Sequence, residues 1–193
     1  MSQQPTPRNT ENSELKIRVA CPDDGAAIAT IYVPIVRDTF ISFEIDPPTA
    51  EDMSVRIAST LAQYPWLVAE DRGTVIGYAY GSAHRSRSAY QWSCDVSVYV
   101  DANSQGRGLG RLLYTGLLAI LKRQNYAAAY AGIALPNDAS VAIHERMGFR
   151  LIGVYPRVGF KHGSWRDVGW WHLPLADLSD EPPGPIPFPQ LAP

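Results

Sequence analysis

The sequence predicts a single α/β domain in which helices pack against one sheet. Short alternating or apolar segments, typical of strands, are interspersed with segments of helical period along residues 15–176. The chain has 193 residues, 46% hydrophobic and 19% charged, enough for one sizeable core. Residues 1–14 are polar and aperiodic, and residues 177–193 are rich in proline. We therefore expect a disordered leader at 1–14, one domain at 15–176 and a Pro-rich, extended or disordered tail at 177–193.

Composition and charge argue against several classes of function. The net charge of −2 gives no generally basic surface for nucleic acid. The cysteines, Cys21 and Cys94, fit neither a disulfide framework nor metal spacing, and His84, His162 and His172 are too scattered for a metal site. No apolar run approaches the roughly 18 residues of a spanning helix, and the N-terminus does not resemble a signal peptide. We expect a soluble, cytoplasmic protein with no metal and no nucleic-acid or membrane partner.

The first half of the chain alternates strand and helix signals. A strand at 15–20 precedes a helix opened by Pro22-Asp23-Asp24, in which Ile28, Ile31 and Ile35 recur at helical spacing. Thr49 and Asp52 form a variant capping box that starts a second helix. Strands at 66–69 and 75–80 flank Asp71-Arg72-Gly73, a hairpin signal.

The second half continues the pattern around a glycine-rich connector. We expect a strand at 92–100, the connector at 101–111, a helix from about 112 to 121, and a central strand at 126–134. Asn137 caps a further helix through Met147, which Gly148 ends. Strands at 149–155 and 167–173 close the domain, joined by a loop at 159–165.

Strand, glycine connector and helix in this order favour an anion cradle, because backbone N–H groups and the helix dipole converge there. The connector reads Gln105-x-x-Gly108-x-Gly110, which matches neither the G-x-G-x-x-G pattern nor the P-loop. Arg107 and Arg111 flank the glycines and supply charge for a pyrophosphate. The alternative is a simple glycine-rich turn that enters a helix.

The strand before the cradle is expected to carry polar side chains on one face and apolar side chains on the other. Because strand side chains alternate, Asp95, Ser97 and Tyr99 share one face, while Cys94 falls with the valines on the other. This parity predicts that Cys94 belongs to the core rather than acting as an acyl nucleophile. Asp95 is the candidate for chemistry, and a solvated strand residue is the alternative.

The cradle resembles motif A of the GNAT superfamily of N-acetyltransferases, and residues 137–149 resemble its motif B. Further segments are similar to the phosphinothricin acetyltransferase family, which includes relatives acting on methionine sulfone and sulfoximine. The resemblance spans roughly Lys16 to Leu175 and implies a mixed, mainly antiparallel central sheet flanked by helices, splayed near Val98. The matching segments are 64–70, Ala89-Tyr90-x-Trp92, 97–100, 135–138, His144-Glu145 and 161–169.

The resemblance implies acetyl-CoA as co-substrate, with its pantetheine arm along the strand and its pyrophosphate on the connector. It also implies that the Val98 N–H stabilises the thioester oxyanion. The cofactor-binding residues implied are Val98, Tyr99, Val100, Gln105, Gly106, Arg107, Gly108, Leu109, Gly110, Arg111 and Asn137.

Two residues are expected to be catalytic. Asp95 stands where the family has a glutamate that acts as general base, and it is one methylene shorter. A water relay, a shifted substrate or a slower reaction would accommodate this difference. His144 lies where many members place a tyrosine that protonates the leaving thiolate; a structural helical histidine is the alternative.

The family match also suggests the substrate residues: Arg87 and Tyr90 for the charged end, Arg85 as a close second, and Phe43 and Lys161 along the pocket. The family's Trp-His-Asp reads Trp165-Arg166-Asp167 here, which puts the role of that histidine in doubt. The expected acceptor is the α-amine of a small amino acid or analogue, as in herbicide or antibiotic resistance, and a homodimer is implied. A different amine, a protein N-terminus, or a non-catalytic acyl-CoA-binding module are the alternatives.

Overall fold

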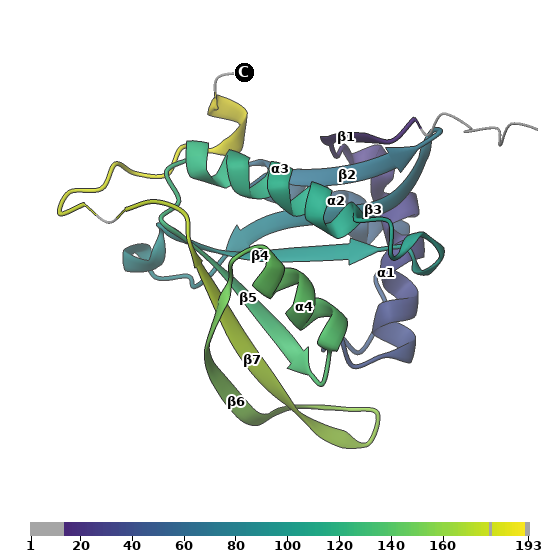
Figure 1. The fold of residues 1–193 in the computed structure, drawn as a ribbon. Helices are drawn as coiled ribbons and strands as arrows, with labels where there is room; N and C mark the ends of the chain where they lie inside the picture. Colours follow the sequence, from purple (N-terminus) through teal and green to yellow (C-terminus); the bar gives the residue numbers. More distant parts are fainter. Residues whose placement is uncertain (1–13, 178, 192–193) are drawn as a thin grey trace, which may run out of the picture.

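The computed structural model describes residues 14–177 and 179–191 and contains one mixed sheet with helices on both faces (Figure 1). The strand order in this part of the chain is β1-β2-β3-β4-β5-β7-β6. Neighbours are antiparallel except β4 and β5, which are parallel, so the predicted mixed, mainly antiparallel sheet is confirmed. The strands are β1 Lys16–Val19, β2 Trp66–Asp71, β3 Thr74–Ala83, β4 Ser93–Val100, β5 Ala128–Leu135, β6 Arg150–Lys161 and β7 Ser164–Pro174. The α-helices are α1 Gly25–Asp38, α2 Ala50–Leu61, α3 Leu109–Arg123 and α4 Asp138–Arg146.

Each face of the sheet has its own core. On one face α3 buries Leu113 and Leu117 against the sheet, and α4 lies over β5 and β7 on that same side (Figure 1). On the other face α1 and α2 bury Ile28 and Ile57 beneath β2 and β3. Strand β4 contributes to both cores, since Val96 packs with the α3 cluster and Tyr99 with the α1 cluster. The predicted alternation along this strand is confirmed.

Strands β4 and β5 stay paired over a short stretch only. Their register runs from Ser93 opposite Ala128 to Asp95 opposite Tyr130. Beyond Asp95, β4 continues to Val100 against β3, while β5 continues against β7. The sheet therefore opens from Val96 onward, and Val98 lies within the expected splay.

Local signals set where the helices begin. Thr49 Oγ1 accepts a hydrogen bond from Asp52 N at 3.1 Å, and the Asp52 carboxylate accepts one from Thr49 N at 2.9 Å, which is the predicted reciprocal cap of α2. Helix α3 begins at Leu109, three residues before the expected start. Gly108 is its N-cap with φ 76°, a left-handed conformation that favours glycine.

The loop expected at 159–165 is wrong. Strand β6 continues to Lys161 and β7 begins at Ser164, so the two form one long hairpin. Its turn is made by His162 and Gly163, with φ values of 49° and 71°. Consecutive positive φ values match the twist of a two-residue hairpin turn, and the glycine at 163 was the sequence signal for it.

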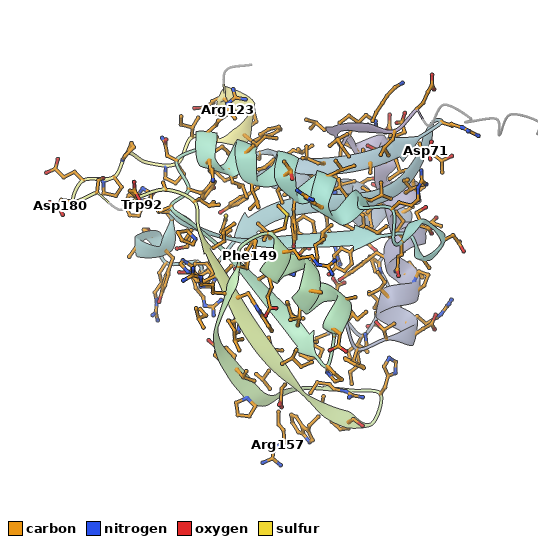
Figure 2. The ribbon with its side chains drawn as sticks, in the orientation of Figure 1. Asp71, Trp92, Arg123, Phe149, Arg157 and Asp180 are labelled. Carbon is orange, nitrogen blue, oxygen red and sulfur yellow. The ribbon has the colours of Figure 1, made fainter. Side chains whose placement is uncertain are left out.

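The tail at 177–193 was expected to be extended or disordered, and its described residues are irregular but bonded to the domain. A short 3-10 turn at Phe188–Gln190 and several hydrogen bonds attach residues 183–191 to the domain. Ile186 N donates to Gln124 O at 2.9 Å, Phe188 N donates to Gln63 O at 3.1 Å, and Trp92 Nε1 donates to Pro183 O at 2.8 Å. Figure 2 shows Trp92 beside this segment. The prolines disfavour α-helix and sheet in this segment, but the Pro183 carbonyl still accepts a hydrogen bond from the domain.

The expected leader falls almost entirely on residues 1–13, which lie outside the described residues. Within the described part, no helix combines the length and apolar character needed to cross a bilayer.

Candidate active site

A groove of about 470 Å³ lies where the splayed end of β4 meets the connector and helices α3 and α4. Gly106 and Gly108 both have φ 76°, and a Cβ built on either would meet nothing within 4 Å. Their backbone therefore faces open space at the start of α3, where free N–H groups and the helix dipole attract anions. The groove is lined by residues including Val98, Tyr99, Val100, Gln105, Gly106, Gly108, Leu109, Gly110, Arg111 and Asn137.

Gly110 sets how closely α3 and α4 approach. A Cβ on this glycine would lie 2.5 Å from Ile143 Cδ1, which is closer than real contacts allow. Gly110 thus allows close packing of Ile143 and is part of the wall of the groove.

The cations near the groove differ from those expected. Arg111 lines it as predicted. Arg107 does not, because its guanidinium donates to the Asp71 carboxylate at 2.7 Å. Arg146, in the last turn of α4, lines the groove and was missed. Arg146 follows Ile143 by one helical turn, so both side chains lie on the same face of α4, and this spacing was the sequence signal for Arg146. Glycine backbone, a helix start and two arginines fit the phosphates of coenzyme A.

A second cavity of about 510 Å³ lies on the other side of β4 and contains Asp95. It shares Ser97 and Tyr99 with a small cavity that also touches Asn137 and reaches the cofactor groove. A cofactor in the groove can therefore meet an acceptor beside Asp95. The further lining residues are Ile41, Ser42, Phe43, Ser82, Val96, Gly132, Ala134, Tyr155, Val158, Val168 and Trp170.

Asp95 is mostly buried, and its environment raises the pKa of its carboxyl because burial disfavours the charged form. A hydrogen bond with His84, at 2.7 Å from Nδ1 to Oδ1, opposes that shift. His84 lies 11 residues before Asp95, and nothing in the local sequence marks it as the partner of this carboxyl. A carboxyl with a raised pKa in a cavity is typical of a general base.

Cys94 faces away from this cavity, as its parity predicted. Its side chain is fully buried, and its thiol contacts Ala128 O at 3.6 Å. Burial raises the pKa of this thiol, so the reactive thiolate is strongly disfavoured. An acyl-cysteine mechanism is therefore not supported by the structure.

His144 is 4% exposed and lies on the wall of the small cavity. Its Nδ1–H donates to Ser140 O at 2.7 Å, and its Nε2 accepts from the Tyr114 hydroxyl at 2.8 Å. Burial lowers the pKa of the imidazole. The residue is thus placed near the junction of the cavities as a neutral, hydrogen-bonded ring.

The expected substrate residues are only partly brought together. Phe43 lines the acceptor cavity. Among the described residues that line this cavity, Arg85, Arg87, Tyr90 and Lys161 do not occur. The Lys161 ammonium, buried in the core, donates to the carbonyls of Val36 and Ser42 at 2.6 and 2.7 Å and so ties the hairpin to α1. This correction could not be read from the sequence, because the carbonyls lie more than a hundred residues away.

The neighbouring arginines lie on the segment that follows β3. Arg85 stacks over the Trp170 ring, 5.5 Å from its centroid, and Arg87 is exposed. Tyr90 is close to His84, with ring centroids 6.0 Å apart. These side chains are outside the cavity lining but next to residues that touch it. The described residues contain no group of three or more His, Cys, Asp or Glu side chains placed to hold a metal ion.

Comparisons with known proteins identify the family of this chain. Residues 17–170 match the model of the acetyltransferase (GNAT) domain. A phosphinothricin N-acetyltransferase of Streptomyces viridochromogenes is 38% identical over 161 residues, covering 83% of this chain and 88% of the relative. An L-methionine sulfoximine/L-methionine sulfone acetyltransferase of Salmonella typhimurium is 35% identical over 162 residues, covering 83% and 95%.

A solved structure is similar over nearly the whole chain. The crystal structure of a GNAT superfamily phosphinothricin acetyltransferase from Sinorhizobium meliloti, in complex with acetyl-CoA, has a TM-score of 0.84 and 32% identity. It covers 92% of this chain and 98% of its own. With the family model over most of its length and relatives above one third identity, this chain belongs to the GNAT family of acetyltransferases.

Proposed function

We propose that this protein transfers the acetyl group of acetyl-CoA to the α-amine of a small amino acid or analogue, of the phosphinothricin, methionine sulfone or methionine sulfoximine type. The observation that carries the proposal is the meeting of the cofactor groove and the Asp95 cavity at the splayed end of β4. The names of the relatives support the class of acceptor, and a relative crystallised with acetyl-CoA supports the co-substrate.

Acetyl-CoA, when bound, supplies an activated thioester carbonyl. An ammonium group has no lone pair to attack it, so Asp95 takes one proton and leaves a free amine. The Val98 N–H, on the stretch of β4 that pairs with β3 but no longer with β5, stabilises the negative charge that develops on the carbonyl oxygen. His144 lies on the small cavity, where release of its Nε2 from the Tyr114 hydroxyl would let it carry the second proton of the amine to the leaving thiolate. Arg111, Arg146 and the connector glycines hold the phosphates.

The acceptor cavity favours a compact substrate with a largely apolar body. Phe43, Tyr155 and Trp170 form aromatic walls, and Ser82 and Ser97 add hydroxyls. We assign the substrate carboxylate to Arg85 and Arg87, which lie beside the cavity rather than in it. A second candidate is an amine without a carboxylate. It is favoured by the absence of Lys and Arg from the lining that the described residues provide.

We also propose a homodimer formed through β6. This strand is at the edge of the sheet, and apolar residues along it are exposed, Ile152 to 59%. An exposed apolar edge strand otherwise promotes aggregation, and a second copy related by a two-fold axis would cover it. Sedimentation should show a dimer for the wild type and a monomer for Ile152→Lys. We place the enzyme in the cytoplasm, where acetyl-CoA is available and where it would inactivate toxic amino-acid analogues.

The test is an acceptor panel followed by thiol release. The purified protein is incubated with acetyl-CoA and with phosphinothricin, methionine sulfone, methionine sulfoximine and the common amino acids, each beside its decarboxylated amine. We expect turnover of at least one α-amino acid and little turnover of its decarboxylated counterpart. Equal turnover of both would favour the second candidate, and thiol release from none would leave an acyl-CoA-binding module.

A further inference from the structure

Asp95 does not stand alone in its cavity, because the chain register brings a histidine to it. Strands β3 and β4 pair so that Ser82 lies opposite Asp95 and Ala83 opposite Cys94. His84 follows directly after β3, and its Nδ1 lies 2.7 Å from Asp95 Oδ1. A carboxylate only accepts hydrogen bonds, so with Asp95 ionised the Nδ1 atom carries the hydrogen. His84 Nδ1–H therefore donates a charge-assisted hydrogen bond to one oxygen of the Asp95 carboxylate.

The ring of His84 is held by neighbours from other strands. It stacks on Tyr130 of β5 with centroids 4.4 Å apart and planes inclined by 19°. The edge of Trp170 of β7 meets it with centroids 5.7 Å apart and planes inclined by 86°. Tyr130 is the residue opposite Asp95 in the parallel register. Three strands thus fix both members of the pair, which is what precise positioning of a proton acceptor requires.

We propose that His84 is the positioning residue for Asp95, so that the pair performs the proton abstraction that a single longer carboxylate performs elsewhere in the family. This inference rests on the proposed function. His84 holds Oδ1, while Oδ2 has no hydrogen-bond partner among the described residues and belongs to a side chain that lines the acceptor cavity. With Oδ1 held by His84, Oδ2 is the oxygen left to take the proton of the substrate ammonium.

The reaction transfers two protons away from the substrate nitrogen. One proton moves from the substrate ammonium to Asp95 Oδ2 and later to solvent. The nitrogen lone pair then forms a bond to the thioester carbon, the carbon–sulfur bond breaks, and the nitrogen's second proton ends on the sulfur. The products are an amide, a thiol and one released proton. His84 keeps its Nδ1 hydrogen throughout, so its role is to orient the carboxylate and favour its ionised form.

Loss of His84 should shift the titration of Asp95 in a known direction. Burial raises the pKa of Asp95, and the hydrogen bond and charge of His84 lower it, followed by the charge of Arg85. Without His84 the pKa rises further, so the carboxylate is protonated up to a higher pH. The other titratable groups near the pair are Tyr80 on β3, Tyr90 on the segment of His84, Cys94 on β4, Tyr130 on β5, His172 on β7 and Tyr64 before β2.

The first experiment compares His84→Phe, His84→Asn and His172→Phe in their pH profiles of kcat and KM. Asparagine places an amide N–H near the position of Nδ1 and should keep most of the activity. Phenylalanine keeps the stack on Tyr130 without the donor and should lower kcat by about tenfold or more and move the acidic limb to higher pH. His172 contacts the same Tyr130, with ring centroids 5.0 Å apart and planes inclined by 41°, and is the matched control. If the acidic limb of the kcat profile of His84→Phe lay at the same pH as that of the wild type, the proposal would be overturned.

A second experiment needs no turnover. NMR of the imidazole nitrogens in the full-length protein should show a hydrogen on Nδ1 of His84, and Asp95→Asn should change that signal while leaving His172 unaltered. A His84 signal that is dominated by the Nε2–H form, or that ignores Asp95→Asn, contradicts the pairing. If the wild type turns over no amine, the proposed function fails, but this spectrum still decides the pairing.

Discussion

The hydroxyl of Tyr114 on α3 donates a hydrogen bond to His144 Nε2 on α4, across 2.8 Å. The opposite nitrogen, Nδ1, donates to the Ser140 carbonyl one turn earlier in α4. Both ring nitrogens are therefore engaged between the helices that form the cofactor groove. Since burial lowers the pKa of His144, the neutral ring is the form that fits this network.

The stability of the protein should depend on pH through His144. Its folded-state pKa is lowered from the ordinary 6.5, so between those two values the unfolded chain binds more protons than the folded one. Stability should therefore fall as pH drops below about 6.5 and level off below the folded-state pKa. Urea unfolding of the wild type and of His144→Gln checks this, because the variant should lack that part of the slope. Equal slopes in the two proteins would show that His144 does not titrate differently on folding.

Substitution of two neighbouring arginines should have different effects on the affinity for coenzyme A. Arg111 lines the cofactor groove, whereas Arg107 is paired with Asp71. Arg111→Ala should raise the Kd about tenfold, the size of one charge-assisted hydrogen bond. Arg107→Ala is the matched control and should change the Kd by less than about twofold, because its charge is already engaged. Calorimetric titration with coenzyme A measures both, and a larger effect at Arg107 would contradict the assignment.

Trp170 should contribute to acceptor binding through its indole N–H. That Nε1 is buried and has no hydrogen-bond partner among the described residues, and the ring lines the acceptor cavity. An acceptor with an oxygen near it would satisfy the donor. Trp170→Phe should therefore raise the acceptor KM by about tenfold without lowering the free energy of unfolding through a lost hydrogen bond. Trp165→Phe, at a side chain that is 60% exposed, is the control. An unchanged KM in Trp170→Phe would remove this contact from the account.

The C-terminal segment should stabilise the domain. Gln124 is fully buried, and its side-chain amide donates to Gln63 O at 2.8 Å and to Ile186 O at 2.7 Å. Ending the chain at residue 182 removes the second acceptor and leaves part of a buried amide unpaired, at a cost of about 1–3 kcal/mol. Thermal unfolding should show a lower Tm for this truncation and no change for one that ends at residue 191. Equal Tm values for all three chains would show that the segment adds nothing.

The sequence predicts most of the fold and the local half of the site. The alternation of β4, the capping box at Thr49 and the glycine spacing of the connector depend on neighbours in the chain, and the structure agrees with them. The partners of Arg107, Lys161 and Asp95 depend on residues brought together by folding. Nothing in the sequence around the partner residues Asp71, Val36 and His84 predicts those contacts. The attachment of the tail has the same cause, because the tail contributes main-chain groups, which any residue offers, to its hydrogen bonds with the domain.

The most direct test of the account is the turnover of Asp95→Ala near neutral pH, measured beside its affinity for acetyl-CoA. Removal of a general base should lower kcat by about 10²–10⁴-fold, while the Kd for acetyl-CoA should change little because Asp95 lines the acceptor cavity and not the cofactor groove. Turnover equal to that of the wild type, with the same affinity for acetyl-CoA, would contradict the role of Asp95 as the base.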